Sequence, residues 1–165
     1  MPLLTRSVSA LTLVTLAIAG CSSPAEEADA CGPTRAVVAR AIDGDTIELE
    51  SGERVRYLMI DTPESTNQDE CWGEEAKAVN EALVLGQEIT LTYDAVCTDR
   101  YGRLLAYVAL EGYEINLALV EHGHACVLYL PPNGDHSVED FEAAEELARR
   151  RGSGLWGACV GDLPC

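Results

Sequence analysis

Positive charge is scarce in this sequence. The 165 residues include 11 Lys and Arg against 28 Asp and Glu, which gives a formal net charge of −17. Binding to nucleic acid depends largely on neutralising phosphates with cations, so a broad nucleic-acid-binding surface is excluded unless the few cations are gathered in one place. An acidic exterior is also typical of a solvated surface with no partner. The arginines that could form such a concentration are Arg54, Arg56, Arg100 and Arg103.

The longest apolar run is also short. It covers residues 8–19 behind Arg6, which is too short for a comfortable membrane span, and it predicts an export signal over residues 1–20. Two interpretations stay open: an ordinary secretory signal that yields a secreted protein, or a bacterial lipoprotein signal that places a lipid on Cys21. We favour the lipoprotein, because Cys21 directly follows Ala19-Gly20, and we expect the protein to be lipid-anchored at the cell membrane, outside the cytoplasm. Residues 21–30 are then the lipidated Cys and a polar tether, and residues 31–165 form one domain.

The cysteines lack the spacing of a metal site. No Cys-x-x-Cys pair occurs, so a zinc site is disfavoured. Seven cysteines are present, and setting Cys21 aside leaves an even six, which predicts disulfide bonds in an exported protein. Sequence alone does not fix how they pair. Our expected pairs are Cys31 with Cys97, Cys71 with Cys126, and Cys159 with Cys165.

Acidic side chains and arginines are combined in one short stretch of the chain. The run Asp43-Gly44-Asp45-Thr46 is followed by Arg56 and then by Asp61-Thr62-Pro63-Glu64. Separated carboxylates can hold a divalent cation, and a guanidinium beside them suits the charge of a phosphoryl transition state. A second cluster, Asp99-Arg100-Tyr101-Gly102-Arg103, adds another arginine. The combination predicts a metal-dependent phosphodiesterase.

These motifs resemble those of the thermonucleases, the staphylococcal-nuclease-like family, from about Val37 to Trp156. The resemblance depends on several segments in the family's order, because any one of them alone could arise by chance. Besides the runs given above, they are Gly73-Glu74-Glu75-Ala76, Tyr101 to Tyr107, and Asn116 to Val120.

The resemblance assigns a role to each residue of the site. It implies that Asp45, Asp61 and the backbone carbonyl of Thr62 bind the metal. Ca²⁺ is the expected ion, because it accepts a loose, water-rich shell of oxygen ligands. Asp43 is expected to shape the turn through backbone hydrogen bonds. The expected catalytic residues are Arg56, Arg103 and Glu64, with Glu64 orienting or deprotonating water; the expected substrate-binding residues are Tyr101 and Tyr129.

The resemblance also implies the reaction. We expect a monomeric, calcium-dependent nuclease that hydrolyses phosphodiester bonds in DNA and RNA and leaves 3′-phosphate ends. One alternative is a non-catalytic OB-type nucleic-acid-binding module. Another is a calcium-binding surface lipoprotein, which the acidic composition suits. Neither alternative explains why two arginines and three carboxylates stand at the matched positions.

Alternation of apolar and polar residues predicts strands over residues 35–41, 46–49, 54–60, 88–93 and 104–110, with a further short strand over residues 125–130. Helices are expected over residues 74–85 and 115–121, and from a capping box at Ser137 and Asp140 to Arg151. Strands interrupted by helices predict a mainly β, α+β fold, a five-stranded barrel of the OB type with about three helices. The resemblance implies the same fold.

The three histidines could in principle bind a metal, and Trp156 could serve in packing. His122 and His124 are two residues apart, which places them on different sides of a helix, so a structural role is favoured over zinc binding for these two and for His136. Trp156 is expected to pack the C-terminal tail onto the barrel.

Overall fold

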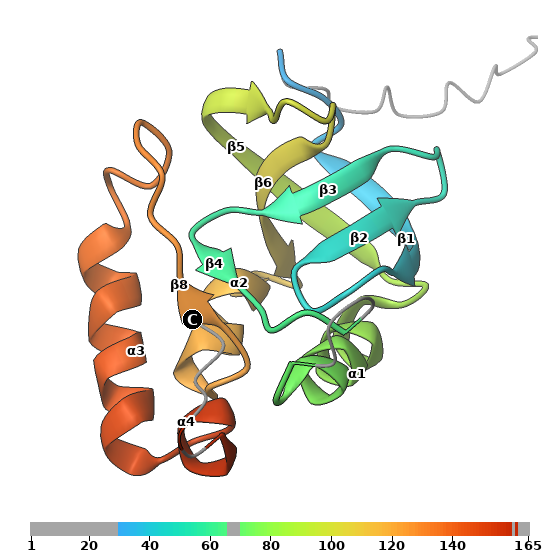
Figure 1. Ribbon diagram of the computed structural model, residues 1–165. Coiled ribbons are helices and arrows are strands. Elements are labelled where there is room, and N and C mark those ends of the chain that lie inside the picture. The colour runs from blue at the N-terminus through green and yellow to red at the C-terminus, as the bar shows by residue number, and fades with distance from the viewer. Residues whose placement is uncertain (1–29, 66–69, 160, 162–165) are drawn as a thin grey trace, which may run out of the picture.

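A small β-barrel forms the centre of the fold (Figure 1). The computed structural model describes residues 30–65, 70–159 and 161. The long strands arise where apolar side chains alternate, so that one face of each strand points inward. The strands are β1 (Arg35–Ala41), β2 (Thr46–Leu49), β3 (Arg54–Tyr57), β4 (Ile60–Asp61), β5 (Glu88–Thr98), β6 (Leu104–Leu110), β7 (Tyr113–Glu114) and β8 (Cys126–Val127).

Pairing between β3 and β6, which stand at opposite ends of the row of long strands, closes the barrel. Antiparallel pairs join β3 to β2, β2 to β1, β1 to β5 and β5 to β6. β3 then pairs in parallel with β6, with Val55 opposite Leu104 and Tyr57 opposite Ala106. The expected five-stranded OB-type barrel is therefore confirmed. The short strand β7 extends β6, and β4 pairs with β8 in a separate two-stranded sheet.

Helices pack around the barrel (Figure 1). α1 (Gly73–Val84) contacts β1, whereas α2 (Ile115–Glu121) lies between β6 and α3 (Val138–Arg151), and the short α4 (Leu155–Ala158) follows α3. The expected positions of the three longer helices are confirmed to within a residue or two. No helix in the described part of the chain has the length and apolarity needed to cross a membrane.

The barrel interior is filled by large apolar side chains, including Ile47, Leu49, Val55, Ile89 and Leu91, each at most 2% exposed. Burying a side chain of this size contributes roughly 1.5–3 kcal/mol. This core fixes the inward face of each strand, because a one-residue slip would turn its apolar side chains outward. The polar faces at the barrel's edge are thereby held in a defined register.

Several details of the expected secondary structure were wrong. β5 continues to Thr98 instead of ending at residue 93, and β8 covers only Cys126–Val127 of the strand expected over residues 125–130. The strand expected over residues 54–60 ends at Tyr57, because Met59 adopts a left-handed conformation (φ 68°) and turns the chain into β4. Buried Asn116 stabilises this turn, because its Nδ2 donates to the Leu58 carbonyl at 2.9 Å. The capping box is absent: Ser137 makes no side-chain cap bond to α3. Its hydroxyl bonds to the Tyr107 hydroxyl at 2.8 Å instead.

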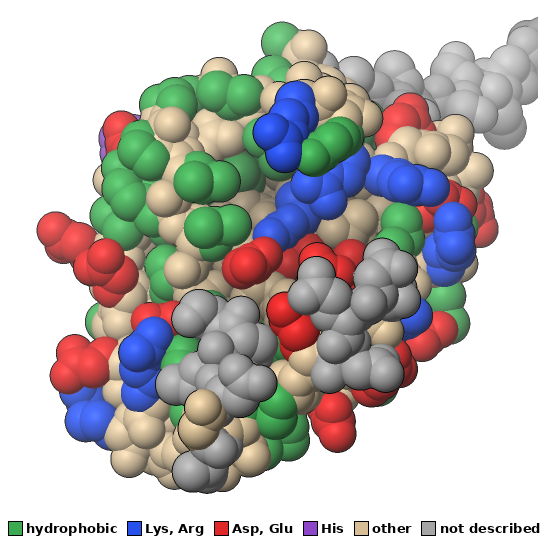
Figure 2. Space-filling view, in the orientation of Figure 1, with side chains coloured by type: hydrophobic (Ala, Val, Ile, Leu, Met, Phe, Trp, Pro, Cys, Tyr) green, Lys and Arg blue, Asp and Glu red, His purple; other side chains and the backbone are tan. Residues whose placement is uncertain are grey.

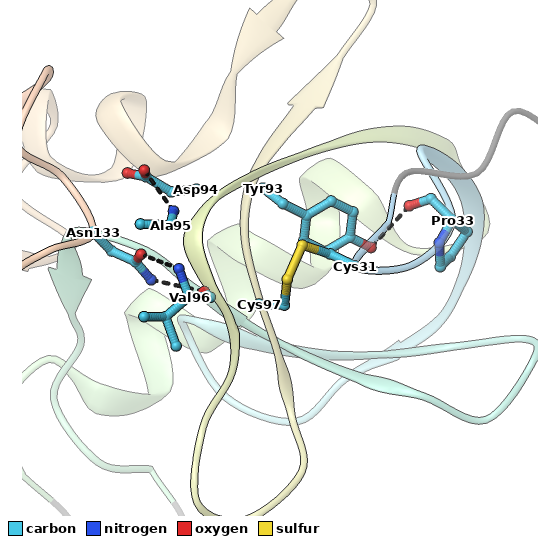
Figure 3. The surroundings of a disulfide bond; sticks show 8 residues. All are labelled: Cys31, Pro33, Tyr93, Asp94, Ala95, Val96, Cys97 and Asn133. Atoms are coloured by element: carbon cyan, nitrogen blue, oxygen red, sulfur yellow. Dashed lines mark hydrogen bonds between the residues drawn. A yellow bond between two sulfur atoms is a disulfide. The ribbon is translucent and has the colours of Figure 1, made fainter.

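The disulfides agree with the expected pattern in part. Cys31 bonds to Cys97 as expected and joins the start of the domain to β5, close to the hydrogen bond from Tyr93 to the Pro33 carbonyl (Figure 3). The expected pairs Cys71–Cys126 and Cys159–Cys165 were wrong, because Cys71 bonds to Cys159. Cys126 is disulfide-bonded as well. Each cysteine in the described part of the chain is therefore oxidised, as is common in proteins of oxidising compartments.

Candidate functional site

The turn between β1 and β2 is held by a chain of hydrogen bonds that starts in the core. The buried Tyr57 hydroxyl donates to Asn80 Oδ1 at 2.9 Å, and Asn80 Nδ2 donates to the Asp43 carbonyl at 3.0 Å. Asp43 Oδ1 then accepts the Asp45 N–H at 3.1 Å, so its expected turn-shaping role is confirmed. Asn80 carries no motif that would mark this role, and the one signal in the sequence is its spacing, four residues after buried Ala76 on the inner face of α1.

Asp45 joins this turn to the loop after β4. Its side chain is buried, and Oδ2 accepts hydrogen bonds from the Thr62 N–H at 2.9 Å and the Thr62 hydroxyl at 3.1 Å. Gly44 permits this approach, because a Cβ at that position would lie 2.7 Å from the Thr62 side chain. The structure thus brings together two motifs that are 17 residues apart in the chain.

Arg56 binds both of the expected acidic metal ligands. Its Nη1 lies 3.0 Å from Asp45 Oδ2, and its Nη2 lies 2.6 Å from Asp61 Oδ1. Nη1 also donates to the carbonyls of Tyr57 at 3.1 Å and Ile60 at 2.8 Å. With its side chain only 13% exposed and held by several acceptors, the guanidinium has one orientation, at the mouth of the barrel.

Negative charge accumulates around Arg56. Burial raises the pKa of Asp45 to about 7, against the opposing effect of Arg56. Burial, together with neighbouring carboxylates, also raises the pKa values of Asp61 and Glu64. Neighbouring carboxylates disfavour one another's ionised form, and a divalent cation between them would stabilise that form. Carboxylate oxygens are also the ligands that Ca²⁺ prefers. The donor set therefore fits the expected ion.

The described residues contain no group of three or more His, Cys, Asp or Glu side chains placed to hold a metal ion together. Side chains alone thus do not form a complete cage there. A site formed by Asp45, Asp61, the Thr62 carbonyl and water, as the resemblance implies, needs only two carboxylates and remains compatible with this finding.

The backbone of Glu64 is held in position by two hydrogen bonds to Glu70. The Glu64 N–H donates to Glu70 Oε2 at 2.8 Å, and the Glu70 N–H donates back to the Glu64 carbonyl at 3.2 Å. Gly73, the first residue of α1, packs so tightly that an added Cβ would lie 2.5 Å from the Glu64 carbonyl oxygen. The Glu64 side chain itself is exposed, within electrostatic range of Asp61 and Arg56. The carboxylate is therefore available to solvent water beside the acidic cluster.

Arg103 is fixed by its own turn. Asp99 Oδ2 accepts from Arg103 Nε at 2.7 Å, while Asp99 Oδ1 accepts the N–H groups of Tyr101 at 2.8 Å and Arg103 at 3.0 Å. Burial opposes ionisation of Asp99, but these hydrogen bonds outweigh it and lower the pKa of the carboxyl. Asp99 is thus a charged partner that positions Arg103, a role the sequence analysis did not assign to it.

Arg56 and Arg103 line the same cavity, of about 340 Å³. β3 and β6 are parallel neighbours, so Arg56 in β3 and Arg103 in the turn just before β6 approach the cavity from the same side of the sheet's edge. Its opposite wall is apolar, with Val96, Leu105, Leu128, Leu130 and Pro132. Figure 2 shows the corresponding band of basic side chains with acidic side chains directly beside it and hydrophobic ones on its other side.

The two expected substrate-binding tyrosines differ in placement. Tyr101 is exposed, with its ring 5.7 Å from the Arg103 guanidinium carbon, so it lies beside the site. Tyr129 does not line the cavity, and its hydroxyl donates to Asp135 at 2.5 Å. Its neighbours Leu128 and Leu130 line the cavity instead, because alternate side chains of an extended segment point to opposite sides.

His124 and Trp156 contribute to packing, whereas His122 and His136 are exposed. His124 Nδ1 accepts a hydrogen bond from Trp72 Nε1 at 3.0 Å, and the two rings stack. Trp156 packs in a small cluster with Cys126 and Cys159 and lies under the Arg149 guanidinium, 4.1 Å from the ring centre. This cluster joins the C-terminal helices rather than the barrel core, so Trp156 packs the end of the chain as expected but against a different surface.

Comparisons with known proteins agree with this geometry. Residues 54–158 match the family described as staphylococcal nuclease homologue. The chain is 36% identical over 124 residues to the SPbeta prophage-derived endonuclease YokF and to Endonuclease YncB, both of Bacillus subtilis (strain 168). It is also 33% identical over 126 residues to a thermonuclease of Staphylococcus intermedius.

These alignments cover different shares of the relatives. The alignments with YokF and YncB each span 71% of this chain, but only 42% of YokF and 59% of YncB. The alignment with the Staphylococcus intermedius protein spans 73% of this chain and 74% of that protein. The chain thus matches only part of the two Bacillus proteins. The family match contains Arg56, Asp61, Glu64 and Arg103, the residues that surround the cavity and the acidic cluster. By fold, by site and by sequence, the chain belongs to the staphylococcal nuclease family.

Proposed function

We propose that this protein is a calcium-dependent nuclease that hydrolyses phosphodiester bonds in DNA and RNA. The observation that supports this proposal most strongly is the position of Arg56 and Arg103. Both guanidiniums are fixed by carboxylates and line one cavity beside Asp45 and Asp61. A partly buried arginine pair at the edge of an acidic cluster suits a phosphate that arrives with a divalent cation.

The metal-binding residues in this proposal are Asp45, Asp61 and the carbonyl of Thr62. A bound Ca²⁺ would neutralise the carboxylates and the phosphate charge. Asp45 is already oriented by two hydrogen bonds from Thr62 to Oδ2 and one from the Thr46 hydroxyl to Oδ1 at 3.0 Å, so the position of its carboxylate is set before an ion binds. The more exposed Asp61 supplies the solvent-facing side of the site.

Glu64 has the role of orienting or deprotonating the attacking water. Its backbone is held by Glu70, and its carboxylate is exposed to solvent. Burial and the carboxylates of Asp43 and Asp61 raise its pKa above the ordinary value for Glu, which makes the carboxylate a stronger base. Much of the rate then comes from positioning and electrostatics rather than from the strength of this base.

Arg56 and Arg103 would stabilise the charge that develops on the phosphoryl group in the transition state. Each arginine presents a planar fork of N–H donors to the cavity. Because Asp99 holds Arg103 and Asp61 holds Arg56, their orientation is set before the substrate binds. All of these residues come from one chain, and we propose that the protein acts as a monomer.

The non-catalytic alternatives are less well supported. A binding module that has lost its catalytic residues would have substitutions among them, whereas here both arginines and all three carboxylates are present, with Arg56 in contact with Asp45 and Asp61. A calcium-binding surface protein gives no reason for Arg56 and Arg103 to line one cavity.

The products test the reaction. With calcium present, 5′-labelled single-stranded DNA and RNA should both be cut, and the fragments should end in 3′-phosphate groups. A phosphatase that removes 3′-phosphates would then shift the mobility of each fragment on a gel. Fragments that carry 3′-hydroxyl ends would show that the other side of the phosphodiester is attacked, and uncut strands would reject the nuclease.

We further propose that the protein is lipid-anchored through Cys21, outside the cytoplasm. Residues 1–29 lie outside the described residues, so this proposal depends on the signal sequence and on Cys21 after Ala19-Gly20. The disulfides in the domain fit an extracytoplasmic location. Several acyl chains on one Cys hold a protein at a membrane far more firmly than a single chain does.

Cys21→Ser should therefore release the protein from the membrane fraction or block its maturation. Cell fractionation and mass spectrometry of the mature N-terminus measure this. An unmodified N-terminus and unchanged fractionation would reject the anchor and favour plain secretion.

A further inference from the structure

Glu64, which acts on water in the proposed reaction, is held by the short stretch of chain that leads into α1. Its N–H donates to Glu70 Oε2 at 2.8 Å, and the Gly73 N–H donates to the Glu70 carbonyl at 3.0 Å. Gly73 also packs directly against the Glu64 carbonyl. Residues 70–73 therefore set the position of Glu64, and whatever fixes this stretch bears on the reaction.

Two neighbouring residues of this stretch are attached to the C-terminal part of the fold. Cys71 forms a disulfide with buried Cys159, which directly follows α4. Trp72 Nε1 donates to His124 Nδ1 at 3.0 Å, and the two rings stack with their centres 6.1 Å apart. The stretch thus has a covalent and a non-covalent attachment side by side.

Cys159 and His124 belong to one tightly packed unit. α4 packs on the turn after α2, because the Leu155 N–H donates to the Gly123 carbonyl at 2.9 Å, and a Cβ at Gly154 would collide with that carbonyl. Leu155 is fully buried, and its own carbonyl accepts the Cys159 N–H at 2.9 Å. His124 directly follows Gly123. Both attachments of residues 71 and 72 therefore lead to the same anchored surface.

The backbone of Trp72 depends on these attachments. Its φ is 76°, in the left-handed region that is unfavourable for a bulky residue. Such a conformation persists only where the surrounding structure holds it. If the disulfide and the contact with His124 were lost, Trp72 would relax toward an ordinary conformation, and Glu70, two residues earlier, would shift with it.

We propose that the Cys71–Cys159 disulfide and the Trp72–His124 pair are positioning residues for Glu64. The inference rests on the proposed function, because it requires Glu64 to act on the attacking water. Near the reacting atoms a displacement of about 1 Å can lower the rate roughly a hundredfold, so a loosened stretch slows turnover although no group that touches the substrate is removed. Full turnover then requires that Cys71 and Cys159 are oxidised, as they are in the structure.

The two arginines of the site are held by other contacts. Arg56 is held by Asp45 and Asp61, and Arg103 is held within its own turn. These contacts do not involve residues 70–73. Loss of the disulfide should therefore lower kcat, whereas KM and the calcium concentration for half-maximal activity should stay near the wild-type values.

A double-mutant cycle tests the proposal. Cys71→Ser with Cys159→Ala removes the disulfide, both in the wild-type protein and in Glu64→Gln. The matched control is Cys31→Ser with Cys97→Ala, which removes a disulfide that joins the start of the domain to β5. We measure kcat, KM and the calcium dependence of DNA cleavage for each protein, and circular dichroism to show that the barrel is intact.

Removing the Cys71–Cys159 bond should lower kcat about tenfold in the wild-type background. In Glu64→Gln the same change should lower kcat by less than about twofold, because the group that the bond positions is already lost. Removing the Cys31–Cys97 bond should change kcat by the same factor in both backgrounds. Trp72→Phe keeps the disulfide but loses the Nε1 donor, and it should show the same dependence on Glu64 with a smaller effect.

A second measurement does not depend on activity. The N–H groups of Glu64 and Gly73 both donate to Glu70, so their amide hydrogens should exchange faster once the Cys71–Cys159 bond is removed. NMR measures this exchange without calcium or substrate. Removing the control disulfide should leave both exchange rates unchanged.

The positioning role is rejected if removing the Cys71–Cys159 bond leaves kcat unchanged, or lowers it equally with and without Glu64, because the bond would then act on the whole fold. If this variant does not fold, the same cycle with Trp72→Phe decides. Failure here can be told from failure of the proposed function. Calcium-dependent cleavage with additive effects would reject the positioning role alone, whereas a wild-type protein that cuts no nucleic acid would reject the nuclease and this role with it.

Discussion

Replacing Arg103 by Ala should reduce turnover of single-stranded DNA by about a hundredfold to a thousandfold, the usual cost of losing one electrostatic donor to a transition state. Affinity for the substrate should change much less, because the interaction strengthens only as charge develops on the phosphoryl group. Arg103→Lys should recover little activity. A lysine keeps the charge but loses the planar fork that Asp99 Oδ2 now holds at Nε.

The measurement is kcat and KM for wild type, Arg103→Ala and Arg103→Lys under saturating calcium. Arg150→Gln is the control for the loss of one surface positive charge. Circular dichroism before each assay would show whether the barrel is intact, which is expected because Arg103 lies in a turn outside the core. A rise in KM with kcat unchanged would mean that Arg103 binds the ground state only, and the proposed role would be wrong.

Replacing Glu64 by Gln should lower kcat by about a hundredfold or more, which is typical of losing a general base. Glutamine keeps the size of the side chain, and the Glu64 backbone contacts with Glu70 do not depend on the carboxylate. The calcium concentration for half-maximal activity should stay near that of the wild type, because we assign the metal to Asp45 and Asp61.

Asp45→Asn is the matched counterpart, since it also exchanges a carboxylate for an amide. It should raise the calcium concentration needed for half-maximal activity. It also leaves Arg56 with one carboxylate fewer, because Arg56 now lies 3.0 Å from Asp45 Oδ2. A calcium titration of activity for both variants separates the roles. The assignments would be reversed if Glu64→Gln shifted the calcium dependence and Asp45→Asn did not.

Much of the fold follows from patterns that one strand or helix carries by itself. Alternation of apolar residues marks the five barrel strands, because one face of each is buried. The break at Met59 could not be predicted, since the local pattern continues through residues 54–60. It depends on Asn116, which holds the Leu58 carbonyl from a helix 58 residues away in the chain.

The central residues of the candidate site could be found from motifs, because each combines charged residues that chemistry requires at fixed spacings. Their mutual contacts could not. Arg56 reaches Asp45 only because β2 and β3 pair with Thr46 opposite Arg56. The positioning roles of Asn80 and Asp99 could not be predicted for a related reason. A buried Asn on a helix and an Asp in a turn are ordinary residues until the structure shows which loop or guanidinium they hold.

The pairing of the cysteines and the direction of the Tyr129 side chain could not be predicted from the sequence. Sequence separation does not determine which cysteines meet, and Cys71 meets Cys159 because α1 begins beside the C-terminal helices. Tyr129 was chosen by position in a motif, but a shift of one residue in an extended segment exchanges the two faces. Leu128 and Leu130 occupy the cavity wall as a result, so its surface is aliphatic there.

Cleavage of single-stranded DNA by the wild-type protein as a function of free calcium tests the central claim most directly. The claim is that carboxylates gathered around Arg56, together with Arg103, form a calcium-dependent phosphodiesterase site. We predict no cleavage in EGTA, and cleavage that rises to saturation when calcium is restored in excess of the chelator. Undiminished cleavage in EGTA, or intact DNA at every calcium concentration across neutral to alkaline pH, would contradict it.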